Sequence, residues 1–280
     1  MSDQEEPLPS FQKPPVVEVA LSVQFDALKG LGTPQIGLLW QEFRSRLPVT
    51  EEQAPLEPQV ERFGAARRPF LGVAFQMMSK PPAPRCWFLN TEGTELIQVQ
   101  TDRFIHNWRK AGEGDQYPRY ERLRKAFEEE LGQFVKFIER ENLGQFVPNQ
   151  CEVSYVNHIV PGAVWKNHGD LDKAITVFQR HYSDNFLGAA EEANTNLQFV
   201  ISGATGEPIG RLHVSASPVF GVKDDLPMLH LSLTARGRPE KEGIDGVMKF
   251  LDLGRNWVVR GFKSITTPEM HREWRIQNAG

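Results

Sequence analysis

The sequence contains few cysteines, no long apolar run and no excess of positive charge. Its two cysteines, Cys86 and Cys151, provide no disulfide framework, and the acidic, proline-rich start of the chain shows no export signal, so both are expected to be reduced. No apolar stretch approaches the roughly 20 residues that a membrane helix needs. A net charge of -4 gives no general attraction to nucleic acid or to an anionic membrane. We therefore expect a cytoplasmic protein without a membrane segment, and a nucleic-acid partner is disfavoured.

The common catalytic and nucleotide-binding motifs are absent as well. The sequence has no His-Glu-x-x-His, Cys-x-x-Cys, Gly-x-Ser-x-Gly or Gly-x-Gly-x-x-Gly, and no phosphate loop ending in Gly-Lys-Ser/Thr. The glycine-rich residues 203–210 join two predicted strands and include no lysine, which favours a hairpin loop over a phosphate cradle. The sequence therefore predicts no catalytic residue, no cofactor and no metal site.

The hydrophobic pattern indicates an α+β fold. Residues 16–25 alternate between apolar and polar side chains, which is typical of a half-buried strand. Residues 118–142 and 243–262 carry apolar side chains at helical spacing, and Phe127, Phe134, Leu251 and Trp257 are expected in the core.

The order β-α-β-β-β-α occurs twice along the chain. The predicted elements of the first unit are a strand at 16–25, a helix at 34–47, an acidic loop at 50–58, strands at 70–77, 85–89 and 96–108 (the last one bent), and a helix at 118–142. Those of the second unit are a strand at 151–159, a helix at 171–182, strands at 197–202, 211–217 and 228–236, and a helix at 243–262. We expect a flexible tail at 1–15, the two units at 16–146 and 147–265, and a C-terminal extension at 266–280.

Two such units would form one mainly antiparallel sheet of about eight strands, because each strand has one apolar and one polar face. The helices would cover the apolar face, and the polar face would stay open. In general shape this arrangement resembles the saddle of the TATA-binding protein or the duplicated modules of effector-binding domains. A likeness of this kind concerns the fold and assigns no function.

Several segments resemble a family of sporadically distributed, uncharacterised bacterial proteins. They are Lys13-Pro14-Pro15-Val16-Val17-Glu18, residues 96–104 (Leu-Ile-Gln-Val-Gln-Thr-Asp-Arg-Phe), Asn107-Trp108-Arg109, Tyr117-Pro118, Tyr155-Val156-Asn157, and Phe262 with residues 266–274. The resemblance covers nearly the whole chain and transfers no catalytic residue. It implies a bacterial, cytosolic origin and a setting in mobile or defence-related gene clusters.

The first candidate site lies on the polar face of two predicted strands in the second unit. Its side chains alternate with apolar ones, and they are Arg211, His213, Ser215, His230, Ser232 and Arg236. If the two strands form a hairpin, His213 and His230 could lie opposite each other. The cluster then predicts a weakly cationic groove for an anionic or hydroxylated ligand. The alternative is a solvated sheet face, and a metal site would need a third ligand.

The second candidate site is the end of the predicted strand 96–108, with Asp102, Arg103, His106 and Trp108. Asp102 and His106 could serve in acid-base chemistry. The structural alternative is that Trp108 covers an edge of the core and that Asp102 pairs with an arginine.

Two functions of different classes follow from these sites. In the first, the chain is a non-enzymatic binding protein whose polar sheet face receives a partner protein, a peptide or a small effector. In the second, it is an enzyme that uses Asp102 with His106, or His213 with His230. The scarcity of lysine on the polar face disfavours nucleic acid in either case.

Overall fold

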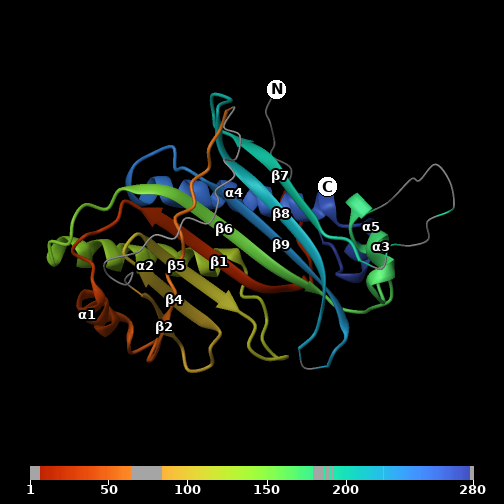
Figure 1. Cartoon of the computed structure of the whole chain (residues 1–280), viewed down its shortest axis with the longest axis horizontal. Helices are drawn as coiled ribbons and strands as arrows, with labels where there is room; N and C mark the ends of the chain where they lie inside the picture. Colours follow the sequence, from red (N-terminus) through yellow and green to blue (C-terminus); the bar gives the residue numbers. More distant parts are fainter. Residues whose placement is uncertain are drawn as a thin grey trace.

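The structure is a computed structural model that describes residues 7–64, 84–178, 186, 190, 192–222 and 224–277. The described chain is an α+β protein with one antiparallel sheet of nine strands and five α-helices, as the hydrophobic pattern predicts for the class (Figure 1). The helices are α1 (Thr33–Phe43), α2 (Tyr120–Arg140), α3 (Leu171–Ala174), α4 (Gly243–Ile265) and α5 (Pro268–Glu273).

The strands follow each other across the sheet in the order β2-β3-β4-β5-β1-β6-β9-β8-β7. Their bounds are β1 (Val16–Phe25), β2 (Val49–Gln53), β3 (Arg85–Leu89), β4 (Glu95–Gln100), β5 (Arg103–Arg109), β6 (Pro148–Ile159), β7 (Thr195–Ser202), β8 (Pro208–Phe220) and β9 (Pro227–Gly237). At the centre β1 pairs antiparallel with β6, so that Leu21 lies opposite Val153 and Val23 lies opposite Cys151. The first strand of each half of the chain therefore forms the middle of the sheet.

The two long helices α2 and α4 pack on one face of the sheet. Phe127 and Phe134 of α2 and Leu251 of α4 are fully buried, whereas Trp257 is half-buried. The helices also meet each other, because Tyr120 and Arg124 of α2 donate hydrogen bonds to the Asp252 carboxylate of α4. The apolar stripes that helical spacing predicts are therefore the surfaces that close the core.

The predicted bent strand at 96–108 is wrong, because the chain reverses there and forms the two strands β4 and β5. Gln100 pairs with Arg103 across a turn at Thr101 and Asp102. The apolar side chains that face the helices have odd residue numbers before the turn, as at Val99, and even residue numbers after it, as at Phe104. Such a change of parity indicates a two-residue reversal, because a continuous strand keeps its parity.

Two other predicted elements differ from the structure. Residues 49–53 form the edge strand β2, where a loop was expected, and its charged, exposed side chains are typical of sheet edges. The predicted helix at 171–182 is only the short α3, followed by a 3-10 turn at Thr176–Phe178, and the rest of that range lies outside the described residues. The predicted strand at 70–77 also lies outside them.

The start of the described chain packs against its end. Phe11 is buried, with its ring 5.4 Å from that of Phe262 and 6.1 Å from that of Trp274. Its backbone forms a bridge to Ile276. Part of the range predicted as a tail is thus held on the helix side of the molecule.

The face of the sheet opposite to α2 and α4 carries residues 54–64, which we call the strap. Figure 1 shows it leaving β2 and running across the strands toward β8. The polar face is therefore covered along this line, although its side chains are those that the alternation predicts.

Candidate functional site

The strap is held on the polar face by glutamine side chains that bind its backbone. Leu56 donates its N–H to Gln100 Oε1 and accepts from Gln100 Nε2, both at 2.9 Å. Gln59 N–H donates to Gln24 Oε1 at 3.0 Å, and Glu61 N–H donates to Gln150 Oε1 at 3.3 Å. These contacts use only peptide groups, so they would hold any extended chain in this place.

The strap ends in a carboxylate clamp built from the first candidate site. Arg211 Nη1 lies 2.5 Å and His213 Nε2 2.6 Å from the carboxylate oxygens of Glu61, whose side chain is 7% exposed. Arg236 Nη1 is 3.7 Å from the same carboxylate and donates through Nε to Glu152 at 2.6 Å. Burial favours a raised pKa for Glu61, but hydrogen bonds from His213 and Arg211 outweigh it and lower that pKa.

The structure brings together only part of the predicted first site. Arg211 lies opposite Arg236, and Ser215 lies opposite Ser232. His213, however, faces Thr234, and His230 faces Ser217, four positions farther along the hairpin. Four residues of strand span about 13 Å, so the expected pairing of His213 with His230 is wrong. The alternation allows any even shift of register, which is why it could not fix this pairing.

His230 instead meets His158 of β6. His230 Nδ1 is 3.3 Å from His158 Nε2, and both side chains are partly buried on the polar face. Burial lowers the pKa of both imidazoles, and the neighbouring His230 lowers the pKa of His158 further, while Glu18 opposes the shift at His230. The folded chain therefore resists protonation of this pair.

This pair should make the protein less stable in mild acid. The unfolded histidines take up protons as the pH falls through about 6.5, whereas the folded ones take them up only at lower pH, so the folded state loses its advantage below about 6.5. The difference in free energy of unfolding between about pH 7.5 and about pH 5.5 should shrink when both are replaced (His158→Gln, His230→Gln). Urea titrations at the two pH values measure it, and His271, whose pKa burial also lowers, stays as a common background. If the double variant shows the same difference in free energy of unfolding as the unchanged protein, His158 and His230 are not the source of the pH dependence.

The second candidate site is divided between the two faces. Arg103 lies on the polar face and donates to the Gln24 side chain at 2.6 Å and to the Glu57 carbonyl at 3.1 Å. Asp102 accepts from Gln100 at 2.7 Å. Trp108 is buried on the helix side with its ring 5.6 Å from that of Tyr117, as the structural alternative predicts, but Asp102 forms no ion pair with an arginine among the described residues.

His106 pairs with Glu130 of α2 and not with Asp102. The distance from Nδ1 to Glu130 Oε2 is 2.8 Å, and the two side chains are 1% and 4% exposed. Arg46 forms an ion pair with the other oxygen of Glu130. No sequence pattern indicated this contact, because Glu130 lies among exposed charges of a long helix.

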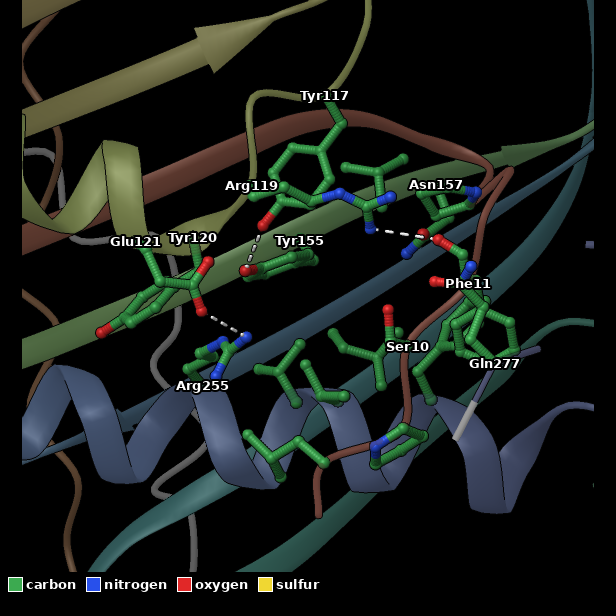
Figure 2. Close-up of a pocket in the computed structure, with 18 residues that line it drawn as sticks. Ser10, Phe11, Tyr117, Arg119, Tyr120, Glu121, Tyr155, Asn157, Arg255 and Gln277 are labelled. Atoms are coloured by element: carbon green, nitrogen blue, oxygen red, sulfur yellow. Dashed lines mark hydrogen bonds and ion pairs between the residues drawn. The ribbon is translucent and has the colours of Figure 1, made fainter. Parts of the chain in front are cut away.

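A pocket of about 320 Å³ lies on the helix side of the sheet, between α2 and α4 (Figure 2). We call it the Tyr117–Tyr155 pocket, because these two hydroxyl groups lie 2.7 Å apart in it. Arg119 donates to the Phe11 carbonyl at 3.0 Å, and Arg255 pairs with Glu121 at 3.0 Å. Asn157 of β6, which is 1% exposed, also lines it. Sequence reasoning assigned no site here, although Tyr117-Pro118 and Tyr155-Val156-Asn157 are among the segments that carry the family resemblance.

In the described part of the chain, no group of three or more His, Cys, Asp or Glu side chains could hold a metal ion. Among the described helices none has both the length and the apolar character needed to cross a membrane.

A search of protein-family models and of curated proteins finds no match to this sequence. The resemblance to sporadically distributed bacterial proteins therefore stays a prediction.

Proposed function

We propose that the chain is a non-enzymatic binding protein whose polar sheet face receives an extended peptide segment with a carboxylate side chain. The observation that carries this proposal is the binding of Glu61 by Arg211, His213 and Arg236 at the end of the strap. In this state the chain's own strap occupies the site that a partner would use.

The chemistry of the face separates two tasks. Gln24, Gln100 and Gln150 contact peptide groups, which every segment presents, and therefore supply affinity without selection. The clamp selects a carboxylate, because charge-assisted hydrogen bonds from guanidinium groups are about twice as strong as neutral ones. Without Glu61, Arg211 and His213 would face the site with no carboxylate partner among the described residues, whereas Arg236 would keep Glu152.

A tethered strap competes strongly with a free partner. A segment joined by a short flexible linker has an effective concentration of about millimolar. A partner must therefore bind with a better clamp contact or with more contacts than the strap makes. The proposal includes displacement of the strap, and it predicts that weakening the clamp opens the face.

A labelled peptide with the sequence of residues 54–64 tests this function. Glu61→Gln removes the carboxylate that the clamp binds, so this variant should bind the peptide at least about tenfold more tightly than the unchanged protein. Adding Arg211→Glu and Arg236→Glu should abolish the binding. Fluorescence polarisation measures the affinities, and circular dichroism checks that each variant is folded.

Glu57→Gln is the matched control, because Glu57 lies on the same strap, is exposed and forms no ion pair in the described structure. It should leave peptide binding as weak as in the unchanged protein. A peptide with Gln at the Glu61 position should bind Glu61→Gln at least about tenfold less tightly than the original peptide. If a folded Glu61→Gln protein binds neither peptide, the face is not a peptide site.

We also propose that the sheet consists of two related units, which would give it a saddle-like form. Support comes from the strand order, in which β1, β5, β4 and β3 follow outward on one side of the centre and β6, β9, β8 and β7 on the other. The long helices α2 and α4 each follow the last strand of their half.

We further propose a cytoplasmic location. Cys86 and Cys151 are buried free thiols, and a reducing compartment preserves thiols of this kind.

A further inference from the structure

In the Tyr117–Tyr155 pocket, one hydroxyl proton is not taken up by the hydrogen bond between the two phenols. The two phenols carry two protons, and their mutual hydrogen bond consumes one of them. Burial raises the pKa of both phenols, that of Tyr155 to about 12, and Arg255 lowers the pKa of Tyr155 relative to burial alone. Either hydroxyl can be the donor within the pair. An acceptor bound beside Arg255 favours the arrangement in which Tyr117 donates to Tyr155 and the Tyr155 O–H donates into the pocket.

Arg255 supplies a second donor beside this hydroxyl. Figure 2 shows its guanidinium close to the end of the pocket where the two hydroxyl groups meet. One terminal nitrogen binds Glu121, whose side chain is 70% exposed, but Nε is buried and has no hydrogen-bond partner in the described structure. A buried donor without a partner costs free energy, so this nitrogen favours a ligand with an acceptor.

One part of the pocket wall is apolar. Val16 and Leu233 of the sheet and Val258 and Phe262 of α4 line it, and Phe11 and Pro14 from the start of the chain lie beside them. A volume of about 320 Å³ is at the lower end of the range for small-molecule sites, about 300–1,000 Å³. The pocket therefore suits one small ligand with an apolar part and a polar end.

The backbone beside the pocket is strained. Arg119 has φ 73° and ψ 155°, a region that residues other than glycine rarely adopt. Its side chain holds the Phe11 carbonyl, so the strained residue ties the start of the chain to the edge of the pocket. Strain of this kind is concentrated at ligand sites, where the surrounding structure holds it in place.

We propose that the Tyr117–Tyr155 pocket binds a small monocarboxylate with an apolar, ring-sized body. The carboxylate accepts hydrogen bonds from Arg255 Nε and from the Tyr155 hydroxyl, and the apolar body lies against Val258 and Phe262. The site is on the face of the sheet opposite to the strap, and it does not depend on the function proposed for the polar face.

Calorimetric titration of the full chain with 3-phenylpropionate and with its neutral amide tests the site. The carboxylate should bind at least about tenfold more tightly than the amide. Arg255→Gln should weaken 3-phenylpropionate binding at least about tenfold, and Tyr155→Phe, which keeps the ring, should weaken it about fivefold to tenfold.

Two nearby substitutions are matched controls. Tyr120→Phe removes a hydroxyl that is bound to Asp252, and Arg124→Gln removes a guanidinium that is bound to Asp252 and Glu128. Both should leave 3-phenylpropionate binding within about twofold of the unchanged protein. The proposal is overturned if the acid and the amide bind equally, if neither binds, or if folded Tyr155→Phe and Arg255→Gln proteins bind the acid as tightly as the unchanged chain.

Discussion

Replacing Phe134 with alanine should lower the free energy of unfolding by about 3–5 kcal/mol, the usual cost of deleting a buried aromatic side chain. Phe134 is fully buried, and its ring lies 5.0 Å from that of Phe104 and 5.6 Å from that of Phe25. It therefore joins α2 to two strands near the centre of the sheet. Denaturant unfolding followed by circular dichroism measures the change.

The control for Phe134→Ala is Gln133→Ala on the same helix. Gln133 is exposed, so its replacement should change the free energy of unfolding by no more than about 0.5 kcal/mol. If the two variants unfold at the same denaturant concentration, α2 does not present this face to the sheet.

Replacing Glu130 with alanine should also cost about 3–5 kcal/mol, although the side chain is charged. Glu130 is 4% exposed and lies between His106 and Arg46, so its loss leaves the buried His106 without its carboxylate partner, whereas Arg46 keeps its ion pair with Glu95. Breaking a buried ion pair from one side is costly because the remaining polar group stays desolvated. Thermal and denaturant unfolding measure the effect.

Glu130→Gln should cost less than Glu130→Ala, because the amide retains an oxygen that can accept a hydrogen bond. Glu129→Ala is the matched control, since Glu129 is exposed and its ion pair with Lys125 is a 3.8 Å surface contact. Its replacement should change stability by no more than about 0.5 kcal/mol. A Glu130→Ala protein as stable as the control would show that the contact of His106 with Glu130 contributes nothing.

Predictions from the sequence were most accurate where the signal is local. The alternation in residues 16–25 identified the apolar side chains of β1 from Val19 to Phe25 that enter the core, although Ser22 and Gln24 of the other face are buried as well. The helical spacing identified Phe127 and Phe134 of α2. The same alternation placed Arg211, His213 and Arg236 on one polar face. A strand's two-residue period and a helix's 3.6-residue period are properties of the neighbouring residues, so they can be read without knowing what packs against them.

Which residues come together in the candidate sites was harder to predict from the sequence. His213 and His230 were correctly placed on adjacent strands and wrongly paired, because the register of a hairpin depends on its turn and its neighbours. The parity change between Val99 and Phe104 was present in the sequence and would have indicated the reversal at Thr101. Gln24, Gln100 and Gln150 likewise stand near strand ends, but glutamine on a polar face has no pattern that distinguishes a ligand contact from a solvated side chain.

The sequence by itself determined the α+β class, the two faces of the central strands and the stripes of the long helices. Only the tertiary structure decided that Glu61 lies against Arg211, 150 positions away, that His106 meets Glu130, and that Tyr117 meets Tyr155. Local periodicity records which side of an element avoids water. Which charged or polar group meets which depends on how the elements pack, because those contacts join residues whose spacing along the chain follows no period.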